Sequence, residues 1–123
     1  MNILKVLTPQ RIVGNFGERA AAKHLKKNGY KILKTNYTAV GNEIDIIAEH
    51  YDTMHFVEVK TRKKGGWQSA YDSIDEQKIR TLRRGAMAYR TIHNIRHNIQ
   101  FDLMAITVDE NEEIDIDYVE NIL

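Results

Sequence analysis

The sequence contains no cysteine and no long uninterrupted run of apolar residues. The absence of cysteine excludes disulfide bonds and metal sites built on thiolates. No segment approaches the roughly 18 apolar residues that a membrane-spanning helix requires. The apolar stretch at residues 3–7 is too short for the apolar core of a secretory signal. We therefore expect a cytoplasmic protein that does not enter a membrane.

Several enzyme motifs are also missing. The five histidines are not paired as in the zinc motif His-Glu-x-x-His, so no role is assigned to them. There is no glycine-rich phosphate loop, no Gly-x-Ser-x-Gly nucleophile turn and no internal repeat.

An overall excess of one charge is absent, since the formal net charge is +1 at pH 7. The charges nevertheless separate along the chain. Residues 60–100 contain ten Lys or Arg and three Asp or Glu, whereas residues 101–123 contain eight Asp or Glu and no basic residue. This distribution predicts a polarised surface; two solvated faces of opposite sign are the alternative.

What is present fits one domain spanning residues 1–123. Hydrophobic spacing and turn residues predict helices at residues 14–28 and 73–93, and strands at 30–37, 42–49, 54–60, 99–108 and 114–119. Asn15 and Ser73 are the expected helix N-caps, Gly29 ends the first helix, and residues 61–72 form a loop. The order α-β-β-β-α-β-β predicts an α/β fold with a central mixed sheet flanked by helices.

Two of the predicted strands carry acidic residues at alternate positions. Because side chains of a strand alternate between its faces, Glu43 shares a face with Asp45, and Glu58 shares one with Lys60. The opposite face of the first strand is then apolar, with Ile44, Ile46 and Ala48. In a hairpin, three carboxylates and one amine would meet on one patch of the sheet.

Crowded carboxylates repel one another and lose solvation, so either a cation or a salt bridge must offset that cost. Mg²⁺ binds oxygen ligands and keeps several waters, so two carboxylates are enough to hold it. Such a metal polarises a phosphoryl oxygen and lowers the pKa of a bound water. Lys60 could then orient the attacking water or stabilise the charge at phosphorus.

The Glu-x-Lys pattern is common by itself, and it recurs at Glu76 and Lys78. On a helix, however, residues two apart diverge by roughly 200°, so only the strand copy can form one site. The alternative for Glu58 and Lys60 is an exposed ion pair on a half-buried strand. Lys78 lies at the edge of the apolar stripe of its helix and would reach the margin of the site.

Glu18 supplies a further candidate acid. It lies within roughly 60° of Ala21, Ala22 and Leu25 on the predicted helix, which is the face expected to pack on the sheet. Buried acids are rare unless they are paired or ligating. Alternatively, Glu18 lies in the first helical turn and complements the helix dipole.

Candidate nucleic-acid contacts fall into two groups. The predicted loop could meet a phosphate backbone, with Trp67 stacking on an unpaired base; its candidate residues are Arg62, Lys63, Lys64, Trp67 and Gln68. On the second helix, Arg80, Arg83 and Arg84 lie away from the apolar stripe, where a solvated helix face is the alternative. Asp102 is expected to be a strand residue that faces a helix or solvent.

Four segments follow one another along the chain: residues 14–21 (GNFGERAA), 29–33 (GYKIL), 41–48 (GNEIDIIA) and 56–62 (FVEVKTR). Together with Lys78, Ala86, Ala88, Tyr89 and the pair Phe101-Asp102, they resemble the YraN-like family of uncharacterised bacterial proteins. The resemblance covers about residues 14–106.

That family is similar to Holliday-junction resolvases and restriction endonucleases of the PD-(D/E)xK fold. The resemblance therefore implies a restriction-endonuclease-like fold. It also implies a helix acid at Glu18, metal-binding acids at Asp45 and Glu58, and the motif lysine at Lys60. Ile44-Asp45 replaces the Pro-Asp of the motif, and Glu43 occupies a position that is usually acidic in the family, so it is placed at the site margin.

The favoured hypothesis is an Mg²⁺- or Mn²⁺-dependent endonuclease acting on DNA, branched or single-stranded. Asp45 and Glu58 would hold the metal with help from the Val59 carbonyl. A junction-cutting enzyme needs two sites, which a homodimer would supply. The alternatives are a non-catalytic nucleic-acid-binding or adaptor domain that retains the fold, and a partner-binding protein that uses the acidic residues 109–120.

Overall fold

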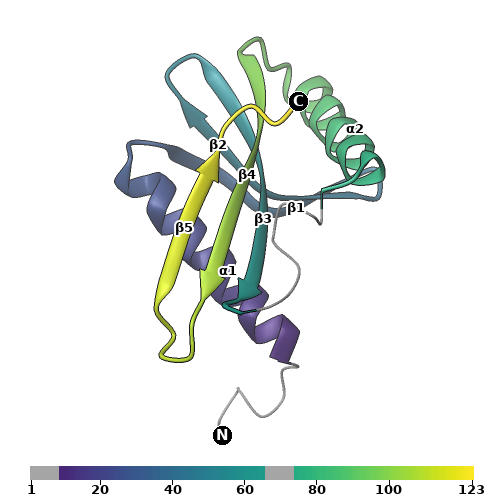
Figure 1. Cartoon of the computed structure of the whole chain (residues 1–123). Helices are drawn as coiled ribbons and strands as arrows, with labels where there is room; N and C mark the ends of the chain where they lie inside the picture. The colour runs from purple at the N-terminus through teal and green to yellow at the C-terminus, as the bar shows by residue number, and fades with distance from the viewer. Residues whose placement is uncertain (1–8, 66–73) are drawn as a thin grey trace, which may run out of the picture.

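The computed structural model describes residues 9–65 and 74–123. These residues form two helices and one five-stranded sheet in the chain order α-β-β-β-α-β-β. The strands lie in the spatial order β1-β2-β3-β4-β5 (Figure 1). The α/β class, the mixed sheet and the element order predicted from the sequence are confirmed, and the architecture is consistent with a restriction-endonuclease-like fold.

Helix α1 (Pro9–Lys27) begins five residues before the expected start. Proline is well tolerated in the first turn of a helix because its missing N–H has no partner there. Asn15 therefore lies within the helix, and its prediction as an N-cap was wrong. The predicted end of the helix is confirmed, because Gly29 takes up a φ of +88°, the left-handed conformation that glycine allows.

The first three strands form the expected antiparallel meander. They are β1 (Lys31–Ala39), β2 (Asn42–His50) and β3 (Thr53–Lys63). A two-residue turn, Val40-Gly41, joins β1 to β2. Strand β3 includes Thr61, Arg62 and Lys63, which were expected to belong to a loop.

Helix α2 (Glu76–His93) connects β3 to its parallel neighbour β4 (Asn98–Val108). The carboxylate of Asp75 caps α2 by accepting a hydrogen bond from the Lys78 N–H at 2.8 Å. The expected cap, Ser73, lies outside the described residues. Strand β5 (Ile114–Val119) pairs antiparallel with β4 at the edge of the sheet.

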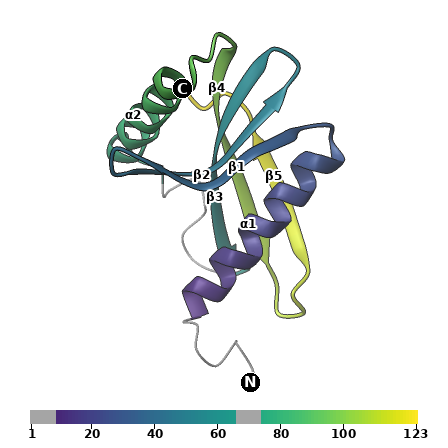
Figure 2. The same cartoon turned by 180° about the vertical axis from the view of Figure 1, so that it is seen from behind.

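The two helices cover opposite faces of the sheet. Helix α1 lies behind the sheet in Figure 1 and in front of it in Figure 2. Its apolar cluster is built from Ala21, Leu25, Ile46, Ala48, Val57, Val59, Met104 and Ile106. The cluster under α2 contains Ile44, Ile47, Met54, Phe56, Leu82, Ala86, Tyr89 and Phe101.

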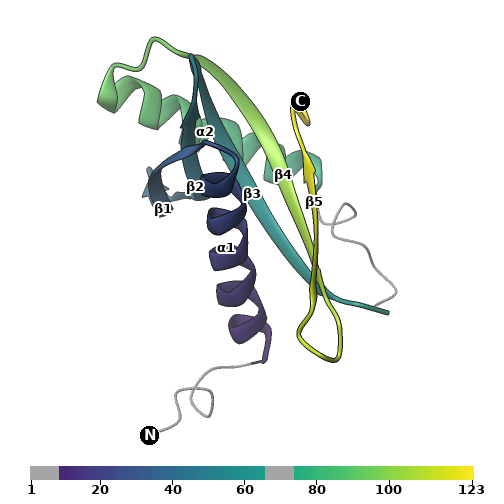
Figure 3. The ribbon, with the colours of Figure 1, turned by 90° about the vertical axis from the view of Figure 1, so that its left-hand side faces the viewer.

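Ile44 departs from the predicted pattern. It was expected to share a face with Ile46 and Ala48, but it packs under α2, whereas those two residues pack under α1. The pairing of β2 with β3 extends only to Ile46 and Val57, and beyond it β2 separates from β3 while it stays paired to β1. The regular alternation of faces is therefore lost at Asp45. Figure 3 shows β3 and β4 side by side, with the β1–β2 hairpin at the C-terminal end of α1.

The acidic end of the chain is largely an ordered edge strand. Ile114, Ile116 and Tyr118 of β5 pack against the α1 cluster, and the acids between them, Asp115 and Asp117, are exposed. Charged side chains on an edge strand discourage pairing with other chains. Over the described ranges, no helix combines the length and apolar character needed to cross a membrane.

Candidate functional site

The predicted acids gather where β2 separates from β3. Asp45 directly precedes Ile46, the first residue of β2 that pairs with β3, and its Oδ2 accepts a hydrogen bond from the Val59 N–H at 2.8 Å. At this point of β3 the Asp45 side chain, and not the backbone of β2, accepts the hydrogen bond of the Val59 N–H. The residues predicted from alternation, Asp45 on β2 and Glu58 on β3, are brought to the same part of the sheet.

Glu58 is almost completely buried, with 1% of its surface exposed. Its Oε1 lies 3.0 Å from the Lys78 Nζ and 3.5 Å from the Lys60 Nζ. Its Oε2 is buried and has no hydrogen-bond partner among the residues that the structure describes. A buried carboxylate oxygen left unpaired is unfavourable, so this atom is one to which a ligand would bind.

Glu18 approaches from α1. The helix comes very close to β3 at Gly17, where an added Cβ would lie 1.8 Å from the Thr61 Oγ1. Partial burial raises the pKa of Glu18, and the charges of Glu43 and Glu58 add to this, while a hydrogen bond with Asn36 opposes it. Glu18 lies halfway along α1, so its alternative interpretation as a first-turn acid is wrong.

Among the acids of the site, Asp45 has a strongly raised pKa. Burial, followed by the charge of Glu58, raises its pKa to about 7, although the Val59 hydrogen bond and the Lys78 charge oppose the shift. The pKa of Lys78 is raised as well, which favours its charged form. Burial would lower its pKa, but Glu58, Asp45 and Glu43 more than offset this and raise it. The acids are therefore close enough to influence one another's ionisation.

The ligand oxygens of Glu18, Asp45 and Glu58 do not all lie within 4.8 Å of one another. Within residues 9–65 and 74–123, one group of three His, Asp or Glu residues has all its ligand atoms within 4.8 Å of one another, and it is a different group. The donor set at the acidic site still fits a hard cation, because it offers carboxylate oxygens, one of them unpartnered, and Mg²⁺ needs only two such ligands beside its waters.

The predicted nucleic-acid contacts are only partly described. Lys63 and Lys64 are exposed at the end of β3, and Arg62 donates from Nη1 to the Thr61 carbonyl at 3.0 Å. Trp67 and Gln68 lie outside the described residues. On α2, Arg80, Arg83 and Arg84 are exposed, and the Arg80 Nη1 lies 3.9 Å from the Glu76 Oε2.

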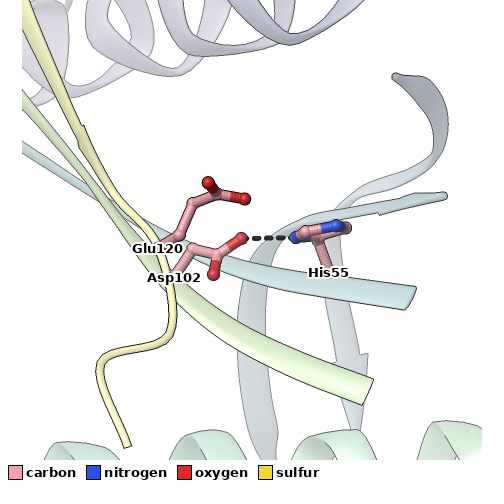
Figure 4. Close-up of side chains that lie close together, drawn as sticks. All are labelled: His55, Asp102 and Glu120. Carbon is pink, nitrogen blue, oxygen red and sulfur yellow. Dashed lines mark hydrogen bonds and ion pairs between the residues drawn. The ribbon is translucent and has the colours of Figure 1, made fainter. Parts of the chain in front are cut away.

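A second polar cluster lies on the α1 face and was not predicted. Asp102, with no exposed surface, accepts hydrogen bonds at both carboxylate oxygens. Figure 4 shows it pointing towards His55, whose Nδ1 lies 2.6 Å away, with Glu120 beside the pair. Its other donors are the Tyr118 hydroxyl, the Gln100 side chain at 2.9 Å and the Asn121 N–H at 2.9 Å.

This cluster is the group of His55, Asp102 and Glu120 whose ligand atoms lie within 4.8 Å of one another. Burial would raise the pKa of Asp102, but the donated hydrogen bonds lower it below its ordinary value. Both carboxylate oxygens are already satisfied, so the network stabilises the fold without a metal. The sequence contained a signal for it: Asp102 interrupts an apolar strand on the same face as Met104 and Ile106.

Comparison with known proteins gives a consistent result. The family described as "Uncharacterised protein family UPF0102" matches residues 17–106. A protein named UPF0102 protein from Syntrophomonas wolfei is 35% identical over 103 residues, which cover 83% of this chain and 90% of that protein. Similar proteins from Alkaliphilus oremlandii and Flavobacterium psychrophilum are 37% identical over 112 residues and 36% identical over 109 residues. These alignments cover 89% of this chain in both cases, and 95% and 91% of the two relatives.

Proposed function

The chain belongs to the uncharacterised protein family UPF0102, also called the YraN family. We propose that it is a metal-dependent endonuclease that hydrolyses phosphodiester bonds of DNA, branched or single-stranded. The observation that carries this proposal is the buried, unpartnered Oε2 of Glu58 beside the Asp45 carboxylate. Two buried carboxylates are costly to ionise together, and a divalent cation would stabilise their ionised form.

Asp45 and Glu58 are the residues that would hold Mg²⁺ or Mn²⁺, with the Val59 carbonyl as a third ligand and Glu18 acting directly or through water. When bound, such an ion polarises a phosphoryl oxygen and lowers the pKa of a bound water. Asp45 would have to lose its proton to ligate the ion, so its pKa of about 7 makes binding favourable above neutral pH.

The two lysines have different roles in this proposal. Lys78 extends from α2, and its contact with Glu58 Oε1 at 3.0 Å fixes the carboxylate and leaves Oε2 for the ligand. Lys60 makes the longer contact, 3.5 Å, and is partly exposed. It is therefore the amine that can turn towards substrate, where it would orient the attacking water and stabilise negative charge on the phosphoryl oxygens.

Cleavage assays on labelled duplex, single-stranded, flap and four-way DNA test the proposal. We expect cleavage in Mn²⁺ that EDTA abolishes and that Asp45→Ala and Glu58→Gln each reduce by at least about 100-fold, as is usual when a group acting in the transition state is removed. Glu113→Gln, an exposed acid on the turn between β4 and β5, is the matched control. Cleavage that is unchanged in Glu58→Gln would indicate a contaminating nuclease.

Metal binding can be measured independently of cleavage. Calorimetry should detect Mn²⁺ binding to the wild-type protein at pH 8 and a strong loss of it in Asp45→Ala. Binding that survives this substitution unchanged would remove the acidic site from consideration as the metal site.

One observation favours a second candidate function. Lys60 and Lys78 already neutralise Glu58 without a cation, as they would in a non-catalytic nucleic-acid-binding or adaptor domain. Such a domain would bind DNA equally well in Mn²⁺ and EDTA, would not cleave it, and would show no heat of Mn²⁺ binding.

A further inference from the structure

A cavity of about 550 Å³ lies between the β1–β2 turn and the middle of α2. It is lined by Val40 and Asn42 from the hairpin and by Arg83, Arg84 and Met87 from the helix. The pocket opens widely to solvent, and its volume is in the range of small-molecule sites. Two arginines and two apolar residues thus line one pocket, and within the pocket lining no acid is present to neutralise the arginines.

The hairpin is held firmly beside the helix. The Asn42 side chain donates to the carbonyls of Ala39 and Val40 at 3.2 and 3.0 Å, which fixes the turn. At Gly85 an added Cβ would lie 2.9 Å from the Ile44 Cδ1 and 3.4 Å from the Asn42 Cβ, so the absence of a side chain permits this close approach. The pocket is therefore a built feature of the fold.

Val40 combines a left-handed conformation with high exposure, as Tyr51 does in the β2–β3 turn. The φ of Val40 is +52°, in the left-handed region that a β-branched residue rarely occupies and that a two-residue hairpin turn normally gives to Asn, Asp or Gly. It is also 84% exposed, so burial does not compensate for the strain. The turn imposes this conformation, so the strain lies in the use of valine there, and strained residues are enriched at functional positions.

The pocket lies near the acidic site. Along α2, Arg83 follows Lys78 by five residues, a rise of about 7.5 Å, and along β2 Asp45 follows Asn42 by three residues, about 10 Å. With a rise of about 3.4 Å per nucleotide in a stacked strand, two or three nucleotides span that separation.

We propose that this pocket binds an unpaired nucleotide of the DNA strand, a few nucleotides from the phosphate that lies at the acidic site. Arg83 and Arg84 contact its phosphate, and Val40 and Met87 contact the face of its base. The inference rests on the proposed function in taking DNA as the ligand. It deepens that function by requiring a single-stranded segment next to the cleavage point.

Binding measured in EDTA separates this inference from catalysis. Fluorescence anisotropy would be recorded with a labelled duplex carrying a single-stranded tail, and with a series in which an abasic residue is moved along the tail. We expect one tail position at which loss of the base weakens binding by about tenfold, the factor that corresponds to 1.4 kcal/mol. Arg84→Gln and Met87→Asn should weaken binding similarly, whereas the exposed controls Arg96→Gln and Ile92→Asn should not.

The substitution Val40→Asn distinguishes an effect on DNA binding from an effect on the stability of the fold. Asparagine occupies the left-handed conformation more readily than valine, so the melting temperature should rise while DNA affinity falls and dependence on the abasic position disappears. A variant that is more stable yet binds all DNAs as the wild type does would overturn the pocket assignment.

Two other results would also overturn it. One is wild-type binding in EDTA that is absent or indifferent to the abasic position. The other is binding of a polyglutamate peptide with the same dependence on Val40 and Arg84, which would identify an acidic protein segment as the ligand. If the protein meets the binding expectations but does not cleave DNA in Mn²⁺, the pocket assignment is supported and the proposed catalytic function is contradicted.

Discussion

At the scale of single residues, the buried acids Glu58 and Asp102 differ in how their oxygens are satisfied. Both oxygens of Asp102 accept hydrogen bonds, whereas Glu58 pairs with two lysines at Oε1 and, within residues 9–65 and 74–123, has no partner at Oε2. A carboxylate whose hydrogen-bonding capacity is filled contributes to the fold. One that retains a buried free oxygen is the better candidate for binding a ligand.

Asp45→Asn should stabilise the metal-free protein at alkaline pH. The Asp45 pKa is about 7 in the folded protein and near 4 in the unfolded chain, so its contribution to stability falls as pH rises from about 4 to 7. Asparagine keeps an acceptor for the Val59 N–H without the charge. In EDTA, urea unfolding should show a gain of about 1–3 kcal/mol at pH 8 and little difference at pH 4.

The control for this prediction is Asp52→Asn, which alters an exposed acid in the β2–β3 turn. Added Mn²⁺ should stabilise the wild type at pH 8 and leave Asp45→Asn nearly unchanged. An equal destabilisation by Asp45→Asn at pH 4 and pH 8 would contradict the assignment of a raised pKa.

Asp102→Asn should have the opposite dependence on pH. The pKa of Asp102 is lowered in the folded protein, so the stability that its charge contributes is complete above about pH 4 and is lost as the pH falls further. We expect a loss of about 2–4 kcal/mol at pH 7, since His55 and Tyr118 lose a charged acceptor. Urea unfolding at pH 7 and pH 3 measures the difference, which should be smaller at pH 3.

At the scale of elements, the site depends on how closely α1 packs on β3. Gly17 permits that approach, and Glu18 follows it directly in the helix. Gly85 has the same role for α2 against the β1–β2 hairpin. Both glycines lie within helices, where glycine by itself is unfavourable by about 1 kcal/mol relative to alanine. Their presence is explained by packing.

Gly17→Ala should destabilise the protein more than Gly85→Ala does. The new Cβ at position 17 would meet the Thr61 Oγ1 at 1.8 Å on a β-branched strand residue, whereas at position 85 the nearest atom, at 2.9 Å, is the mobile end of Ile44. For Gly17→Ala we expect a loss of about 1–3 kcal/mol in urea unfolding. A gain in stability, as helix propensity alone predicts, would show that α1 is not held against β3 at this point.

At the scale of the whole molecule, charge is distributed unevenly. Exposed acids lie on β5 and in the turn before it, while exposed basic residues lie on α1, at the end of β3 and along α2. Long-range interaction with a polyanion would therefore turn β5 away from DNA. This arrangement predicts DNA binding that weakens steeply with salt.

Lys63→Gln/Lys64→Gln should reduce the salt dependence of DNA binding. Each lost phosphate contact lowers the slope of log affinity against log salt by about one. Anisotropy titrations between 50 and 200 mM salt, roughly the range over which phosphate contacts dominate affinity, would measure this slope. Lys26→Gln/Lys27→Gln, which removes the same charge from the last turn of α1, should leave it unchanged. Equal slopes in all three proteins would exclude a phosphate-contacting role for the end of β3.

The sequence by itself determined the order and type of the elements, because apolar spacing, Gly29 and the turn residues act locally. It also placed Asp45 and Glu58 on neighbouring strands, because a short turn joins those strands, but it did not determine the loss of regular alternation at Asp45. It did not determine the start of α1 at Pro9, because an early helical turn depends on what the turn packs against.

Only the tertiary structure decided how each acid is satisfied. Lys78 lies 20 residues beyond Glu58 in the chain, and His55 lies 47 residues before Asp102, so neither pairing leaves a local pattern. The separation of β2 from β3 at Asp45 and the pocket under Val40 likewise arise from packing between distant segments. Periodicity reports which face a residue occupies, whereas burial, pKa and partners depend on which segments meet across that face.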